Sequence, residues 1–212
     1  MGLRYVALGD SYTIGTSVAV AERWPDRLVE ALREPDGRSL VELVANLAVN
    51  GRTSGDVIRS QLPELDRLRP ELVSLLIGVN DVVQGVPEST YRANIEAILG
   101  ALVGRLPPDR LVVVTTPDYT VTPAGADYGD PTVQRSRIVR SNAVLAEVAA
   151  DARIAVVDIF DISERATTDR TLVASDGLHP SGAQYALWVD RIAPVVRGLL
   201  GSAPADERAR PA

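Results

Sequence analysis

Five short apolar runs recur along this chain, and longer segments with helical periodicity separate them. Most residues in the runs are valine, leucine or isoleucine, with little polar alternation, which is typical of strands buried on both faces of a sheet. The runs span Leu3–Leu8, Leu40–Leu47, Leu72–Ile77, Leu111–Thr116 and Ile154–Ile159. Because strands that alternate with helices form right-handed βαβ units, this pattern predicts a parallel five-stranded sheet covered by helices on both faces.

The segments between the runs carry apolar residues at helical spacing. These segments lie at residues 24–32, 91–102, 132–150 and 182–200. Five strands with such helices favour an α/β fold, a flavodoxin-like three-layer α/β/α sandwich, over a closed eight-stranded barrel. We expect one domain over residues 1–201 and a disordered tail at residues 202–212, and we expect residues 117–131 to form a long loop.

Composition excludes several classes of function. The 212 residues carry a net charge of −6, which argues against a protein that binds nucleic-acid backbones. The chain has no cysteine, and all 22 of its basic residues are arginine, so thiol and lysine chemistry are excluded. No apolar stretch is long enough to cross a bilayer and no signal-peptide pattern opens the chain, so we expect a cytoplasmic protein without integral membrane association.

Four polar clusters follow predicted strands. Ser11 comes after the first strand, Asn50-Gly51 after the second, and Gly78-Val79-Asn80-Asp81 after the third. Asp176-Gly177-Leu178-His179-Pro180 comes after the fifth strand and directly before the last helix. Because ligands of open parallel sheets bind at the carboxyl ends of the strands, we expect the four clusters to meet at one edge.

His179 is the only histidine of the chain, which limits acid–base catalysis near neutral pH to one imidazole. A serine hydroxyl is a weak nucleophile until a base accepts its proton, so His179 is the candidate base for Ser11. Asp176 lies three residues before His179 and can orient its ring, because Gly177 permits a tight turn. The alternative is a helix-entry turn with a surface histidine. A single histidine without cysteine also argues against a zinc site.

Together the four clusters resemble the sequence blocks of the SGNH (GDSL-type) hydrolase family, which includes lysophospholipase-like esterases. Gly9-Asp10-Ser11 is similar to the first block, Asn46–Thr53 to the second, Gly78–Asp81 to the third and Asp176–Pro180 to the last. The resemblance implies the SGNH fold, a catalytic triad of Ser11, Asp176 and His179, and no cofactor or metal. It further implies an oxyanion hole made by the backbone N–H groups of Ser11 and Gly51 and the side-chain amide of Asn80.

Other readings of these residues remain. Asn80 and Gly51 are also common turn residues after strands. For Asp10 and Asp81 we expect loop-bracing rather than catalytic roles, and for Arg52 a solvated side chain rather than a contact with an anionic substrate.

The expected function is hydrolysis of a small-molecule carboxylic ester through an acyl-enzyme on Ser11. Short acyl esters, lysophospholipids and acetylated sugars are all compatible with the sequence. Two alternatives stay open, namely an acyl transferase with the same triad and a non-catalytic binding module of the same fold. We expect specificity to reside in residues 12–21, 82–89 and 117–131. The sequence does not indicate an oligomeric state.

Overall fold

In the computed structural model, which describes residues 2–201, the chain forms a five-stranded parallel sheet of order β2-β1-β3-β4-β5. The strands are β1 (Leu3–Gly9), β2 (Val41–Asn46), β3 (Leu72–Leu76), β4 (Leu111–Val114) and β5 (Ala155–Val157). This is the flavodoxin-like order, and the predicted fold class is therefore confirmed. The disordered tail expected at residues 202–212 lies outside the described residues, and the domain boundary stays a prediction.

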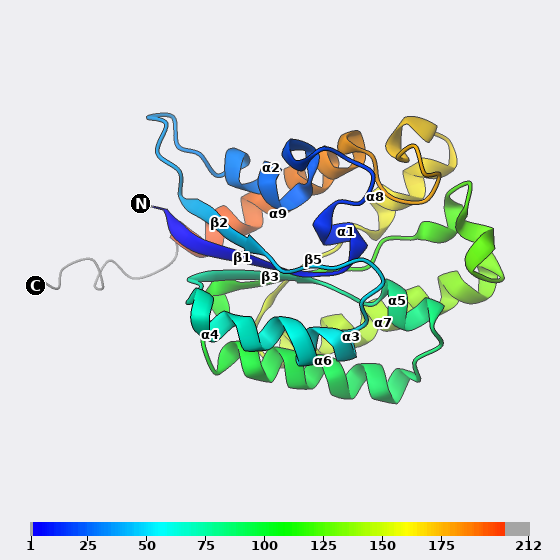
Figure 1. Ribbon diagram of the computed structural model, residues 1–212, viewed down its shortest axis with the longest axis horizontal. Coiled ribbons are helices and arrows are strands. Elements are labelled where there is room, and N and C mark those ends of the chain that lie inside the picture. Colours follow the sequence, from blue (N-terminus) through cyan, green and yellow to red (C-terminus); the bar gives the residue numbers. More distant parts are fainter. Residues whose placement is uncertain (1, 202–212) are drawn as a thin grey trace, which may run out of the picture.

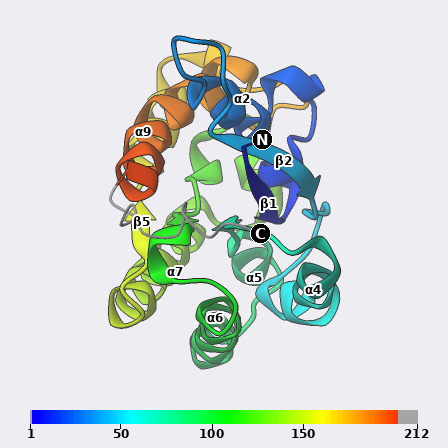
Figure 2. The same cartoon turned by 90° about the vertical axis from the view of Figure 1, so that its left-hand side faces the viewer.

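Helices cover the sheet in two layers, which Figures 1 and 2 show from perpendicular directions. One layer contains α1 (Ser11–Ile14), α2 (Trp24–Ala31), α8 (Phe160–Glu164) and α9 (Gly182–Gly201). The other contains α3 (Ser54–Asp56), α4 (Leu65–Leu68), α5 (Val79–Val83), α6 (Glu88–Val103) and α7 (Pro131–Asp151). The four long helices agree with the predicted segments to within a few residues. Helix α7 begins at Pro131 because the side chain of Asp130 caps it by accepting a hydrogen bond from the N–H of Val133.

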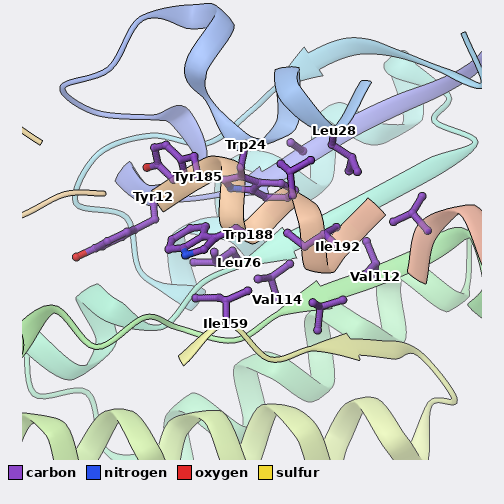
Figure 3. Close-up of a cluster of buried hydrophobic side chains, with 14 of the residues drawn as sticks. Tyr12, Trp24, Leu28, Leu76, Val112, Val114, Ile159, Tyr185, Trp188 and Ile192 are labelled. Carbon is purple, nitrogen blue, oxygen red and sulfur yellow. The ribbon is translucent and has the colours of Figure 1, made fainter. Parts of the chain in front are cut away.

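Each face of the sheet packs its own hydrophobic cluster. The cluster beneath α2 and α9 contains both tryptophans, Trp24 and Trp188, which are fully buried against strand residues such as Leu76 and Val114 (Figure 3). The opposite cluster joins α6 and α7 to the other faces of the same strands. Burial on both faces explains why the central strands β3 and β4 are apolar except at Ser74, whose buried hydroxyl is hydrogen-bonded to the hydroxyl of Tyr5 at 2.7 Å.

Two local features differ from the sequence prediction. Residues 54–68 are helical, but they are divided into α3, a π-helical turn (Val57–Gln61), a 3₁₀ turn (Leu62–Glu64) and α4, so they lack one continuous helical period. Strands β4 and β5 end at Val114 and Val157, two residues before the predicted Thr116 and Ile159. The N–H of Thr115 still donates to the carbonyl of Val157 at 3.0 Å. At Thr116, however, the side-chain amide of Asn142 accepts from the backbone N–H at 2.8 Å and donates to the carbonyl at 2.9 Å, so side-chain bonds replace the regular ladder there.

The expected long loop at residues 117–131 contains two 3₁₀ turns, Tyr119–Val121 and Gly125–Tyr128. It lies against the segment that precedes α9, because the N–H of Ala124 donates to the carbonyl of Gly177 at 2.9 Å. Among the described residues, no helix has the length and apolar character needed to cross a membrane. The cytoplasmic location stays a prediction.

Candidate active site

The end of β1 fixes the position of Ser11. Gly9 has φ +152°, and a Cβ atom there would lie 2.4 Å from the carbonyl oxygen of Leu76, so only glycine fits. The buried amide of Gln61 accepts from the N–H of Gly9 at 2.9 Å and donates to its carbonyl at 2.8 Å. The side chain of Asp10 then caps α1 by accepting from the N–H of Tyr12 at 3.0 Å. Ser11 therefore starts a short helix at the carboxyl edge of the sheet, and it is 7% exposed.

Asp176 and His179 form a closely bonded pair on one loop before α9. Oδ2 of Asp176 lies 2.6 Å from Nδ1 of His179, while Oδ1 accepts from the N–H groups of Leu178 and His179 at 2.9 and 3.0 Å. Gly177 has φ +74°, which closes the turn between the two side chains. Because the ionised carboxylate only accepts hydrogen bonds, Nδ1 carries the proton and Nε2 is left as the basic nitrogen.

Ser11 and His179 line the same cavity, and the ring of Tyr12 contacts the imidazole at a centroid distance of 5.2 Å. Within residues 2–201, no hydrogen bond joins the Ser11 hydroxyl to the His179 ring. Hydrogen bonds between a nucleophile and its base are often long in unliganded enzymes and shorten when the substrate binds.

The three expected oxyanion donors come from three different segments of this edge. Gly51 has φ +76°, and a Cβ atom there would meet nothing within 4 Å. The left-handed backbone therefore requires glycine at this position, rather than any steric crowding of a Cβ atom. Asn80 Nδ2 lies 3.0 Å from the carbonyl of Arg52 and 3.4 Å from Oδ2 of Asp10. In the part of the chain that the structure describes, the N–H groups of Ser11 and Gly51 donate to no protein acceptor.

Asp10 and Asp81 brace these loops, as expected from the sequence. Both side chains are buried, at 0% and 2% exposed. Burial raises the pKa of Asp10 to about 7, with the neighbouring charge of Asp81 acting in the same direction. Burial likewise raises the pKa of Asp81, although Ser54 donates to its carboxylate through both its hydroxyl and its N–H. Arg52 pairs with Asp56 at 3.2 Å on the surface.

The cavity beside Ser11 has a volume of about 220 Å³. Its walls are mainly aromatic and aliphatic, and it is lined by Ser11, Tyr12, Asn50, Gly51, Val79, Asn80, Val83, Tyr119, Tyr128, Leu178 and His179. It thus draws on all three segments in which we expected specificity. Val82 and Val86, which also belong to the expected specificity segment 82–89, line a separate cavity of about 200 Å³ with Asp81.

Two polar residues near the site were not found from the sequence. Gln61 holds Gly9 from 52 residues away, and Ser17 donates to Oδ2 of Asp176 at 2.6 Å from 159 residues away. Neither belongs to a motif, and no local pattern could have indicated such distant contacts. Among residues 2–201, no three His, Cys, Asp or Glu side chains gather where they could hold a metal ion.

A parallel α/β/α sheet that brings a serine, an Asp–His pair and unpaired N–H groups to one edge is the arrangement of an SGNH-type hydrolase. The family model described as "GDSL-like Lipase/Acylhydrolase family" matches residues 7–187, so the chain belongs to that family. The predicted family and enzyme class are thereby confirmed.

Individual relatives agree with this assignment. An arylesterase of Vibrio mimicus is 30% identical over 100 residues, which cover 47% of this chain and 48% of the relative, so the match spans about half of that protein's length. The crystal structure of TesA has a TM-score of 0.72 at 21% identity, covering 92% of this chain and 99% of the other. Axe2, an acetylxylan esterase from Geobacillus stearothermophilus, has a TM-score of 0.69 at 18% identity with 95% of both chains covered. At these identities the structural matches support the shared fold.

Proposed function

We propose that this protein hydrolyses carboxylic esters through an acyl-enzyme on Ser11, with His179 as general base and Asp176 as the residue that orients it. The observation that carries the proposal is the 2.6 Å contact between Asp176 Oδ2 and His179 Nδ1 in a loop that lines the same cavity as Ser11. A structural histidine would need no such partner and no nucleophile beside it.

The first half-reaction begins when Nε2 of His179 accepts the proton of the Ser11 hydroxyl as its oxygen attacks the ester carbonyl. The resulting imidazolium is stabilised by the Asp176 carboxylate and then protonates the leaving alkoxide, so the C–O bond breaks and the alcohol departs. In the second half-reaction His179 deprotonates a water molecule that attacks the acyl-enzyme. Transfer of the imidazolium proton to Ser11 then releases the acid, and no cofactor is consumed.

The negative oxygen of each tetrahedral intermediate is to be bound by the N–H groups of Ser11 and Gly51 and by Nδ2 of Asn80. The absence of protein acceptors for the two N–H groups in the described structure supports this role. Asn80 keeps its 3.0 Å bond to the carbonyl of Arg52 and exchanges its long 3.4 Å contact with Asp10 for the oxyanion. Each such donor typically contributes about 10²–10³ in kcat.

The cavity favours a small, uncharged acyl or aryl group. A volume of about 220 Å³ lies below the usual range for sites that enclose drug-sized ligands. Tyr119 and Tyr128 meet edge to face with ring centroids 6.0 Å apart in its wall, and no Asp, Glu or Arg is among the described residues that line it. The names of the Vibrio mimicus arylesterase and the acetylxylan esterase agree with aryl and acetyl esters, respectively.

A panel of p-nitrophenyl esters of increasing acyl length tests this proposal. We expect the highest kcat/KM for acetyl to butyryl esters, a steep decline for longer chains, and loss of activity in Ser11→Ala. Equal activity of Ser11→Ala and wild type would contradict the mechanism. A maximum at long acyl chains would contradict the assigned substrate class while leaving the mechanism intact.

A further inference from the structure

Ser17 lies on the turn that follows α1, and its hydroxyl donates to Oδ2 of Asp176 at 2.6 Å. That oxygen is the same atom that contacts Nδ1 of His179 at 2.6 Å. With Oδ1 accepting the N–H groups of Leu178 and His179, the carboxylate has four hydrogen bonds, which match its four acceptor positions. Ser17 thus supplies the fourth hydrogen bond to the carboxylate, from a segment that is distant in the sequence.

The turn that presents Ser17 is tied directly to the nucleophile. The N–H groups of Gly15 and Thr16 both donate to the carbonyl of Ser11 at 3.1 Å. A rigid chain of bonds therefore runs from Ser11 through this turn to the Ser17 hydroxyl and across to Asp176. The distance between the nucleophile segment and the acid–base loop is consequently set in part by one hydroxyl group.

Ser17 also occupies a costly backbone conformation. Its φ is +66°, in the left-handed region that serine rarely adopts and that glycine adopts without strain. A position of this kind in an exposed turn ordinarily favours glycine, yet this chain places a hydroxyl there, and the hydroxyl is bonded to the carboxylate. Strained residues of this sort concentrate at functional sites.

Few other groups near Asp176 could hold its carboxylate in place. Its titratable neighbours are His179 on its own loop, Tyr12 on α1 and Tyr185 on α9. In residues 2–201, no arginine pairs with Asp176. Partial burial acts to raise the pKa of this carboxyl, but the bonds from Ser17, Leu178 and His179 outweigh it and hold the pKa below its ordinary value.

We propose that Ser17 is a positioning residue of the catalytic machinery, which holds Asp176 and His179 in register with Ser11 and moderates the attraction between the carboxylate and the imidazolium. The proposal rests on the triad proposed above. Ser17 touches neither the substrate nor the reacting atoms, and it acts through Asp176.

The test compares Ser17→Ala and Ser17→Gly with wild type in the hydrolysis of p-nitrophenyl acetate between pH 5 and 9. Both variants lack the hydroxyl, but glycine also relieves the left-handed strain, so the pair separates the two properties. Ser39→Ala is the matched control, because the Ser39 hydroxyl makes an equally short 2.6 Å bond to the carbonyl of Val41. Val41 begins β2, so this bond lies at the end of the strand that is remote from the active-site edge.

We expect kcat to fall about tenfold in both Ser17 variants, with KM changed less than twofold, because a misplaced catalytic group affects the chemical step. We also expect the acid-side limb of kcat/KM to move to higher pH in both. The reason is that the carboxylate freed of Ser17 attracts the imidazolium more strongly. Ser39→Ala is expected to retain wild-type values.

A Ser17→Gly enzyme with unchanged kcat and an unmoved acid limb would overturn the proposal, whatever Ser17→Ala does, since strain alone would then explain the alanine variant. Failure of the proposed triad would give a different result from failure of the Ser17 proposal. In that case Ser11→Ala or His179→Ala would keep wild-type activity. Those two variants are assayed in the same series.

Discussion

The carboxylate of Asp81 accepts two hydrogen bonds from Ser54, one from the hydroxyl at 2.5 Å and one from the N–H at 2.9 Å. Asp81 follows Asn80 after β3, and Ser54 begins the helical segment that follows the Gly51 turn after β2. This buried bridge therefore holds together two of the three segments that carry the proposed oxyanion donors.

Ser54→Ala tests the bridge. The variant removes one of the two bonds to a buried carboxylate and a partner of Asn94, whose amide donates to the Ser54 hydroxyl at 2.9 Å. We expect the free energy of unfolding to fall by about 1–3 kcal/mol, the usual cost of an unsatisfied buried polar group, and kcat to fall with it. Urea denaturation and steady-state kinetics measure both quantities. Ser60→Ala, which removes an exposed hydroxyl bonded to a carbonyl of the same helical segment, is expected to change neither.

Gln61→Leu is expected to destabilise the protein by about 1–3 kcal/mol, because it removes the Gln61 partner of the buried Gly9 N–H and leaves the Gly9 carbonyl with the longer 3.4 Å bond from the N–H of Val49. The substitution keeps a similar side-chain volume, so loss of packing contributes little. Thermal or urea unfolding checks the value. A loss below about 0.5 kcal/mol would mean that the Gln61 amide does not fix the end of β1.

Asp10 is expected to make stability depend on pH. Its folded pKa of about 7 lies above the value of an exposed aspartate, because the buried side chain disfavours charge. Between about pH 4 and 7 the unfolded chain therefore releases this proton while the folded chain retains it. The contribution of Asp10 to stability is present below this window and is lost progressively as the pH rises through it, by up to about 1.4 kcal/mol per pH unit. Above pH 7 both states are ionised and the loss is complete.

Urea denaturation at pH 5, 6, 7 and 8 measures this effect. From pH 5 to 7 the unfolding free energy of wild type is expected to fall relative to that of Asp10→Asn, because asparagine does not titrate. Above pH 7 the difference between the two proteins is expected to level off. A constant difference over the whole range would contradict the buried, protonated state assigned to Asp10.

The fold was largely predictable because apolar runs report burial on both faces of a strand, which is a local property. The four motifs were also predictable, since each follows a strand or precedes a helix. The features that could not be predicted depend on contacts between segments distant in the sequence. The helical stretch at residues 54–68 changes its period three times, and β4 ends early because the backbone of Thr116 bonds to the side chain of Asn142. The contacts of Gln61 with Gly9 and of Ser17 with Asp176 join segments that no local sequence pattern relates.

The central claim is that Ser11 becomes acylated with His179 as its base, and active-site labelling with a fluorophosphonate measures this most directly. The probe forms a covalent bond with an activated serine, and peptide mass spectrometry locates the adduct. We predict rapid labelling of Ser11 in wild type, none in Ser11→Ala and labelling slowed about 10³-fold or more in His179→Ala. Equal labelling of wild type and Ser11→Ala, or undiminished labelling of Ser11 in His179→Ala, would contradict the account.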